Sequence, residues 1–334
     1  MNVSDRTILE QIERKVGRPV PHRWLGERCV ELDLTAEDSL FSGLIRRHSP
    51  SEKDEIMQLI GHLTALKHLN LRRNKLHQLP ANFANLSELE QLNLGSNYLG
   101  SVPPEIRHFQ QLKYLQLANN DITILPEFIG SYRQLEYLTL HKNINLKSVD
   151  ALAPLTSLKS LNLYFLNLVR LPAFVYRFNR LVTLTLWNMR DFTDDLATLR
   201  NLEYFSVCGT PSLRELPPAL TQLKKLRMIR VFQNSLARLQ EDFGALENLE
   251  QISLYQNQLT QLPESMARLQ KLKKLNLGWN RLARLPEFIA RLPVLEWLAV
   301  FENPLDLAGE SPRFAPTTTV LREWPFTTLA VPGK

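Results

Sequence analysis

The chain has 334 residues, of which 44% are hydrophobic and 22% charged, with a formal net charge of +6. This composition indicates an ordered protein and excludes a disordered one. Because no run of about 18 or more apolar residues occurs, the sequence offers no membrane-spanning helix. The first residues also lack the basic and apolar regions of a secretory signal, so we expect a cytoplasmic protein that does not contact the membrane.

The first predicted element is a helix over residues 4–16. Ser4 or Asp5 can cap its first turn. Its apolar side chains recur at helical spacing and therefore share one face, formed by Ile8, Leu9, Ile12 and Val16. We expect this helix to cover the N-terminal end of the fold, within a helical cap of residues 1–28.

The next element is a short strand over residues 29–34, which begin the pattern that recurs later in the chain. The pattern resumes at Leu66, 37 residues after Cys29, whereas each later unit follows the one before by 21 to 24 residues. We therefore predict a degenerate first repeat that carries an insertion within residues 35–55.

From Leu66 onward, the pattern LxxLxLxxN recurs eleven times. The repeats begin at Leu66, Leu89, Leu112, Leu135, Leu158, Leu181, Leu202, Leu226, Leu249, Leu272 and Leu295. Such a period is the signature of a solenoid, in which each unit buries its apolar face against its neighbours. Each repeat predicts one short parallel strand with positions 1, 4 and 6 pointing inward, followed by a segment with a Leu-Pro step.

The repeat length and the Leu-Pro step, as in NRLARLPEFIARLPV (280–294), resemble intracellular leucine-rich-repeat proteins with 23-residue units. These include the plant Ras-group-related family, Ras-suppressor-type scaffolds, and bacterial repeat proteins. The resemblance covers residues 29–303 and implies an α/β fold. That fold is a right-handed leucine-rich-repeat solenoid, a horseshoe with a parallel sheet on its concave face. It also implies protein binding on that face and no catalysis.

The two cysteines and the C-terminal segment complete this picture. Extracellular proteins of this kind commonly close their ends with cysteine pairs. The two cysteines of this chain, Cys29 and Cys208, lie far apart in the sequence and form no such pair at either end, which favours the cytoplasm. Residues 304–334 lack the repeat spacing and are predicted to form a C-terminal cap. The apolar residues of that cap are Phe314, Val320, Leu321, Trp324 and Phe326.

The second position of the repeat alternates in charge along the chain. The column reads Lys67, Glu90, Lys113, Glu136, Lys159, Val182, Glu203, Arg227, Glu250, Lys273 and Glu296. Opposite charges on adjacent strands attract each other weakly. We therefore interpret this column as a self-neutralising ladder that favours correct register, not as a binding surface.

The seventh position is small near the N-terminus and aromatic in the middle of the chain. With neighbouring positions three and eight, it predicts an exposed aromatic field over about five strand steps, roughly 24 Å. The candidate partner-binding residues are Tyr137, His141, Tyr164, Phe165, Trp187, Tyr204, Phe232 and Tyr255. Exposed aromatic patches mark interfaces. The alternative interpretation is that these rings stack across strands and only cover the sheet.

The asparagine at position nine, expected to cap the turn after each strand, is missing where the aromatic field lies. Three consecutive repeats have Leu166, Met189 and Thr210 instead. Two irregular steps of 21 and 24 residues fall in the same part of the chain. Places where a repeat departs from its own pattern tend to be functional. The missing asparagines and the irregular repeat lengths therefore support the aromatic field as a binding surface.

The sequence contains no nucleotide-binding, hydrolase or zinc motif. His141 and Cys208 share a column, but three strand steps separate them by about 14 Å, which excludes a thiol–imidazole pair. We therefore predict no catalytic residue, no metal site, no cofactor and no enzymatic activity.

The leading functional prediction is a cytoplasmic scaffold in signalling that binds a partner protein on the concave face, and we expect a monomer. The first alternative is glycan or small-ligand binding, since exposed tyrosine and tryptophan rings can stack on sugars. The second is an effector or regulatory module that targets a host or a pathway through protein binding. Lysines and arginines near the first repeats would favour nucleic acid, but the intervening Glu90 and Glu136 argue against it.

Overall fold

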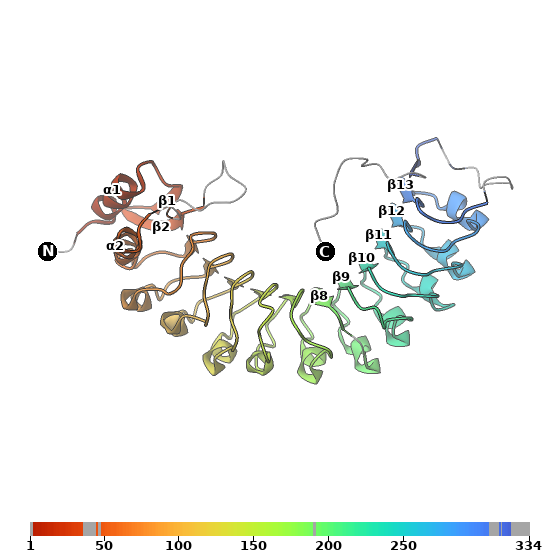
Figure 1. The fold of residues 1–334 in the computed structure, drawn as a ribbon, viewed down its shortest axis with the longest axis horizontal. Coiled ribbons are helices and arrows are strands. Elements are labelled where there is room, and N and C mark those ends of the chain that lie inside the picture. The colour runs from red at the N-terminus through yellow and green to blue at the C-terminus, as the bar shows by residue number, and fades with distance from the viewer. Residues whose placement is uncertain are drawn as a thin grey trace. The chain divides into compact units, whose positions relative to one another are not determined.

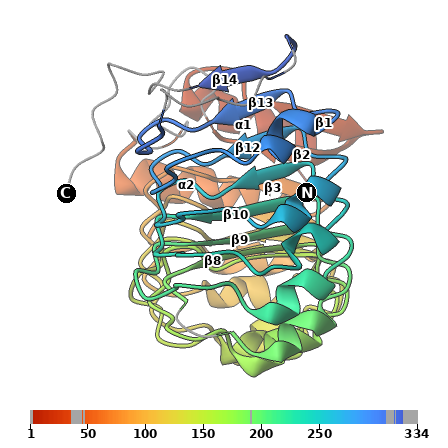
Figure 2. The ribbon, with the colours of Figure 1, turned by 90° about the vertical axis from the view of Figure 1, so that its right-hand side faces the viewer.

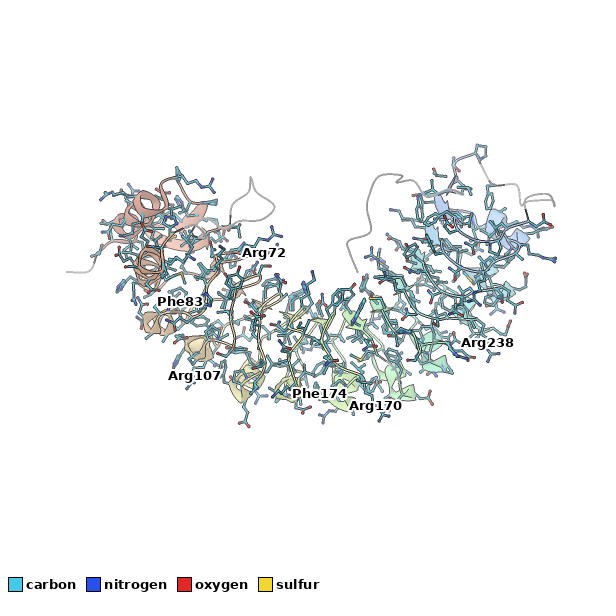
Figure 3. All side chains as sticks on the ribbon, viewed as in Figure 1. Arg72, Phe83, Arg107, Arg170, Phe174 and Arg238 are labelled. Carbon is cyan, nitrogen blue, oxygen red and sulfur yellow. The ribbon has the colours of Figure 1, made fainter. Side chains whose placement is uncertain are left out.

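The computed structural model describes residues 3–35, 45, 48–189, 192–306, 314 and 316–321. Internal contacts divide the chain into two compact units, Met1–Asn167 and Leu168–Lys334. In each unit, short strands line one side and short 3-10 helices line the other (Figure 1). In the N-terminal unit, Arg72 lies on the strand side and Arg107 on the helix side (Figure 3). We call the strand side of a unit its sheet face.

The N-terminal unit begins with helix α1, Asp5–Val16, which confirms the helix predicted from the sequence. The side chain of Ser4 caps it by accepting a hydrogen bond from the Thr7 amide, and Gly17 ends it at a φ of 81°. Ile8, Leu9 and Ile12 are buried as predicted, so the apolar face of the helix packs inward.

A hairpin follows, formed by β1 (His22–Leu25) and β2 (Arg28–Asp33). β2 also pairs in parallel with β3 (His68–Asn70), which confirms the first strand predicted near 29–34. The buried carboxylate of Asp5 joins helix and hairpin, because its Oδ2 accepts from the Cys29 amide and from Arg28 Nε, each at 2.9 Å. The segment expected to be a helical cap thus contains a strand as well as a helix.

The segment expected to hold an insertion is described only in part, because residues 36–44 and 46–47 lie outside the described residues. Helix α2 spans Pro50–Ile60. Ser49 and Glu52 form a reciprocal capping box at its start, and Ile56, Met57 and Ile60 are buried. The insertion over 35–55 and the domain boundaries at 28 and 303 stay predictions.

The remaining strands of the N-terminal unit repeat at intervals of 23 residues. They are β3, then β4 (Gln91–Asn93), β5 (Tyr114–Gln116), β6 (Tyr137–Thr139) and β7 (Ser160–Asn162), each paired in parallel with the next. The 3-10 helices between them are η1 (Ala81–Asn85), η2 (Pro104–His108), η3 (Glu127–Ser131) and η4 (Asp150–Leu152).

The strands of the C-terminal unit lie side by side in chain order (Figure 2). They are β8 (Thr183–Trp187), β9 (Tyr204–Cys208), β10 (Met228–Phe232), β11 (Gln251–Ser253), β12 (Lys274–Asn276), β13 (Trp297–Ala299) and β14 (Thr319–Leu321). The 3-10 helices are η5 (Ala173–Arg177), η6 (Asp194–Thr198), η7 (Pro218–Gln222), η8 (Phe243–Ala245), η9 (Glu264–Arg268) and η10 (Glu287–Arg291).

All twelve strands expected from the repeat pattern are present as β2 to β13. The fold class predicted from the sequence, an α/β repeat solenoid with a parallel sheet, is therefore confirmed. β14 is an additional strand that the spacing did not reveal, with Thr319 opposite Trp297. Trp324 and Phe326 of the expected C-terminal cap lie outside the described residues.

The core of each unit consists of the inward leucines of the strands and apolar side chains from the helix side. In the third repeat, Leu112, Leu115 and Leu117 have no exposed surface, and Phe109 from the preceding turn is equally buried. Burial of each such side chain stabilises the fold by about 1.5–3 kcal/mol. The same positions recur in every repeat, so the core is continuous within each unit.

The position-nine asparagines bond to backbone groups, as the sequence predicted, and all of them are buried except Asn303, which is half-buried. Asn97 donates from Nδ2 to the carbonyls of Leu71 and Leu94 at 3.0 and 2.9 Å. Its Oδ1 accepts from the amides of Asn74 and Leu76 at 2.9 and 3.1 Å. One amide thus joins two consecutive repeats, because it pairs backbone groups that would otherwise be buried without partners.

The alternating charges of position two form the expected ladder. Lys113 Nζ lies 2.7 Å from Glu90 Oε2, and Lys159 Nζ lies 2.8 Å from Glu136 Oε1. In the C-terminal unit, Arg227 Nη2 lies 2.7 Å from Glu250 Oε1. These charges pair with one another, so the ladder residues themselves are weak candidates for partner contacts.

Candidate functional site

The predicted partner-binding residues divide between the two units. Tyr137, His141, Tyr164 and Phe165 belong to the N-terminal unit, and Trp187, Tyr204, Phe232 and Tyr255 belong to the C-terminal unit. Tyr137 is exposed, and the other seven are half-buried. Each unit therefore presents its own aromatic surface.

In the N-terminal unit, Tyr137 is the most accessible of the predicted aromatic residues, with 43% of its surface exposed. It stands on β6 beside Tyr114 of β5, with ring centroids 6.4 Å apart. Beyond the end of β7, the rings of Tyr164 and Phe165 meet edge to face at 4.4 Å. Contacts of this kind hold aromatic side chains in fixed orientations. The two neighbouring rings are therefore supported by each other.

Position eight has a left-handed backbone in each of the eleven repeats from Leu66 onward. The φ values are 64° at Arg73, 58° at Ser96, 55° at Asn119, 59° at Lys142, 54° at Phe165, 54° at Asn188, 66° at Gly209, 56° at Gln233, 56° at Gln256, 54° at Trp279 and 53° at Glu302. This conformation suits glycine and asparagine and costs a bulky residue about 1–2 kcal/mol.

Phe165 and Trp279 are the two bulky aromatic residues that occupy this left-handed position. Neither is required by the turn, since Asn119 and Gly209 hold the same conformation in other repeats. A residue that keeps an energetically unfavourable backbone conformation is a candidate for a functional role. Trp279, with 47% of its surface exposed, was missed by the sequence reasoning. The signal that could have found it is an aromatic residue at position eight, as in Phe165.

His141 follows β6 and is half-buried. Burial lowers the pKa of His141 below its usual range, and the nearby charges of Lys142 and Arg72 act in the same direction. Its Nδ1 is buried and has no hydrogen-bond partner among the described residues. At neutral pH the imidazole is therefore uncharged and extends the apolar character of this surface.

In the C-terminal unit, Trp187 ends β8 and its ring lies over Gly209. A Cβ on Gly209 would lie 2.5 Å from the ring. Cys208, at position seven, is fully buried, so the assignment of that whole column to the exposed face is wrong at this residue. Its small side chain stands between two aligned aromatic residues, Trp187 on β8 and Phe232 on β10. The guanidinium of Arg230 lies 5.8 Å from the Tyr204 ring centre, within the range of a cation–π contact.

Further along the C-terminal unit, Tyr255 and Phe301 approach each other across the intervening repeat, with ring centroids 6.2 Å apart. Gly278 makes this possible, because a Cβ there would lie 2.5 Å from the Phe301 ring. Phe301 is only 3% exposed. It therefore supports Tyr255 more than it offers surface to a partner, while the adjacent Trp279 remains accessible.

Two stretches of the sequence match models of leucine-rich repeats. Residues 47–169 match a model described as a leucine-rich repeat region, and residues 240–282 match one described as leucine rich repeat. The chain therefore contains leucine-rich repeats. No curated protein matches it. The similarity to Ras-suppressor-type scaffolds stays a prediction.

Solved structures with the same fold include an internalin (inlF) from Listeria monocytogenes, at 19% identity and a TM-score of 0.68, covering 91% of this chain and 85% of the internalin. A Leptospira interrogans leucine-rich-repeat protein is 25% identical with a TM-score of 0.53, covering 78% of this chain and 82% of that protein. The Arabidopsis receptor kinase HAESA, in complex with the peptide hormone IDA and the co-receptor SERK1, is 24% identical. Its TM-score is 0.66, over 90% of this chain and 53% of HAESA.

Leucine-rich-repeat proteins generally mediate interactions between proteins, and the fold is typically that of a scaffold without catalysis. Within the described part of the chain, no helix combines the length and apolar character needed to cross a membrane.

Proposed function

We propose that the protein is a non-enzymatic recognition scaffold that binds a partner protein through the aromatic side chains of its sheet faces. In the N-terminal unit these are Tyr137, Tyr164 and Phe165. In the C-terminal unit they are Trp187, Tyr204, Phe232, Tyr255 and, in addition to the sequence prediction, Trp279. His141 contributes an uncharged edge to the first group. The protein acts in the cytoplasm as a monomer.

The observation that carries this proposal is the backbone of Phe165 and Trp279. Both residues keep a left-handed conformation that disfavours large side chains, at φ values of 54°. About half of the Trp279 surface is still available to a partner, since 47% of it is exposed. A bulky ring held at such a position is suited to act as an anchor, because tryptophan and tyrosine dominate the binding energy of protein interfaces.

The charge ladder supports the same conclusion. The ladder residues Glu90 and Lys113 form ion pairs with their neighbours on the sheet face of the N-terminal unit. A partner that bound mainly through charge would have to compete with these pairs. Apolar and aromatic contacts do not face that competition, so an interface built around the rings is the less costly arrangement.

Structural neighbours are consistent with this role without identifying the partner. HAESA is seen with a peptide hormone and a co-receptor, and another neighbour is the complex of Toll with Spatzle. At 24% identity both comparisons concern the fold alone.

Site-specific photo-crosslinking tests the proposal. A benzoylphenylalanine placed at Tyr137 or at Trp279 should form an adduct with one identifiable protein in an extract of the source cells. The matched control positions, Ile124 and Val294, are 64% and 41% exposed and do not lie on the strands. They should not form that adduct.

A second step uses the protein identified in this way. Two variants are compared with the wild type: the double variant Tyr137→Ser/Phe165→Asn and the single variant Trp279→Ser. Each should bind the purified partner at least about tenfold more weakly, because each lacks an aromatic anchor. Adducts at the control positions alone, or unchanged affinity of both variants, would reject the proposal. Crosslinks that disappear after glycan removal would favour the glycan alternative instead.

A further inference from the structure

The N-terminal unit has a cavity that the repeat pattern does not predict. It has a volume of about 500 Å³ and lies where the β1–β2 hairpin meets the strands β3, β4 and β5. Pro21 and His22 of the hairpin form one wall. The floor consists of sheet-face positions three and five, because Glu31 is aligned with His68 and Asp33 with Asn70. The cavity therefore opens on the same face as Tyr137.

Two carboxylates line the cavity, and each retains hydrogen-bonding capacity. Arg23 Nη2 and His68 Nδ1 both contact Oε1 of Glu31, at 2.5 and 2.7 Å. Within the described ranges, no donor is placed on its Oε2. Asp33 Oδ1 already accepts two bonds, from the amide and the hydroxyl of Thr35 at 2.7 and 2.5 Å, whereas its Oδ2 accepts one bond, from Asn70 Nδ2 at 3.1 Å. Since a carboxylate oxygen can accept two bonds, an additional donor can be accommodated at both side chains.

The lining carries a net negative charge in a chain whose overall charge is +6. Among the described residues that line the cavity, none is a lysine or an arginine. Arg23, outside the lining, offsets the charge of Glu31 and leaves that of Asp33. The hydrogen bond from Arg23 also lowers the pKa of Glu31. His68 acts in the same direction, and burial acts in the opposite one. Glu31 is therefore ionised at neutral pH.

The remaining lining groups suit a planar cation. Tyr114 offers an aromatic ring, and Asn70 and Asn93 offer carboxamides. A guanidinium group presents five donors in one plane, pairs with carboxylates through parallel hydrogen bonds, and stacks on aromatic faces. The contact between Arg23 and Glu31 shows that a guanidinium fits this carboxylate from one side.

We propose that this cavity receives an arginine side chain of the partner protein. The inference rests on the proposed function, because the partner is the one that contacts the aromatic surface of the N-terminal unit. Tyr114 connects the two places: it lines the cavity and its ring centroid lies 6.4 Å from that of Tyr137. A segment of the partner that contacts Tyr137 can therefore extend an arginine toward Glu31 and Asp33.

The test uses the intact protein and small probes. Saturation-transfer NMR should detect N-acetyl-arginine amide, and N-acetyl-citrulline amide, which has nearly the same shape without the charge, should bind at least about tenfold more weakly. The corresponding lysine probe should also bind more weakly, because an ammonium group lacks the planar donor pair. Equal binding of arginine and citrulline, or of arginine and lysine, would overturn the assignment.

Variants locate the site. Glu31→Gln should weaken binding of the arginine probe at least about fivefold, and Glu88→Gln, which removes an exposed carboxylate from the same unit, should not. Asp33→Asn tests the second carboxylate. Should that variant fail to fold, the exchange Asp33→Asn, Asn70→Asp keeps the hydrogen-bonded pair and the charge and should retain binding. Unchanged affinity in Glu31→Gln would show that arginine binds elsewhere and would refute the proposal.

The failure of this inference can be distinguished from failure of the proposed function. Tyr137→Ser, Phe165→Asn should leave binding of the arginine probe within about twofold, because neither residue lines the cavity. Glu31→Gln should weaken binding of the crosslinked partner. If the aromatic variant loses the partner and Glu31→Gln does not, the arginine pocket is refuted and the aromatic surface stands. The opposite result refutes the aromatic surface alone.

Discussion

The indole ring of Trp187 lies against Gly209 of the following repeat, so closely that a Cβ on the glycine would lie 2.5 Å from ring carbon Cη2. Gly209 also has a φ of 66°, which side chains disfavour. A glycine is therefore favoured at this position for two reasons. It adopts the left-handed turn readily, and it leaves room for the indole ring of Trp187.

Gly209→Ala should consequently destabilise the protein for two reasons. The new methyl group must displace the indole of Trp187, and the alanine must adopt the left-handed backbone of the glycine. We expect a loss of about 1–3 kcal/mol in the free energy of unfolding, measured by urea denaturation, with a shift in tryptophan fluorescence. Gly100→Ala is the matched control, since its Cβ would meet no atom within 4 Å. Equal effects of the two substitutions would show that the Trp187 contact is not restrictive.

Asn97→Leu should be among the most damaging single substitutions in the N-terminal unit. It leaves the Leu71 carbonyl and the Asn74 and Leu76 amides without their buried partner, and the Leu94 carbonyl keeps only its bond from Asn120 Nδ2. Since a buried group without a hydrogen bond costs about 1–3 kcal/mol, the expected loss is at least about 3 kcal/mol by urea denaturation. The exposed Asn85 provides the control Asn85→Leu, which should cost less than about 0.5 kcal/mol.

Glu136→Lys should weaken the charge ladder. It replaces the partner of Lys159, now 2.8 Å away, with a like charge on the adjacent strand. The melting temperature should fall modestly at low salt, corresponding to at most about 1 kcal/mol, and recover in about 0.5 M salt as screening increases. Glu88→Lys, at an exposed position, should show little of this salt dependence. A melting temperature independent of salt in Glu136→Lys would contradict the ladder.

The stability contributed by Glu31 should depend on pH. Its pKa is below the usual value of 4.5 in the folded protein, because Arg23 and His68 favour the ionised form. Stability from a group with a depressed pKa is fully present above its unfolded pKa and is lost as pH falls through the folded pKa.

The difference in melting temperature between wild type and Glu31→Gln should therefore be largest near neutral pH and shrink below about pH 4. A melting-temperature series from pH 7 to pH 3, with Glu88→Gln as control, checks this. A difference that grows toward low pH would show that these contacts do not stabilise the ionised form of Glu31.

Phe165→Asn should separate folding from binding. Asparagine tolerates the left-handed backbone that Phe165 adopts, as Asn119 and Asn188 do at the same position. Relief of this strain should offset the lost contact with Tyr164, so thermal denaturation should give a stability within about 1 kcal/mol of wild type. Binding of the crosslinked partner should nevertheless fall. A large loss of stability would indicate that Phe165 serves the fold.

The repeat register, the inward leucines and the bonded asparagines could be predicted from the sequence, and so could the strands from Cys29 to Leu295. The physical reason is that every repeat buries the same positions, 1, 4 and 6, against its neighbours. The residue type at each position of the period therefore indicates whether that side chain is buried. The opposed charges of Glu90 and Lys113 were readable for the same reason, since the register places them side by side.

Exposure within a column, in contrast, was decided by tertiary structure. Tyr137 at position three is exposed, whereas Cys208 at position seven is fully buried between the aligned residues Trp187 and Phe232 of the neighbouring strands. The cavity around Glu31 and Asp33 also depends on tertiary structure, since an antiparallel hairpin outside the repeat pattern builds its wall. Contacts between segments that share no period depend on side-chain size and chain path in three dimensions, which the period itself does not encode.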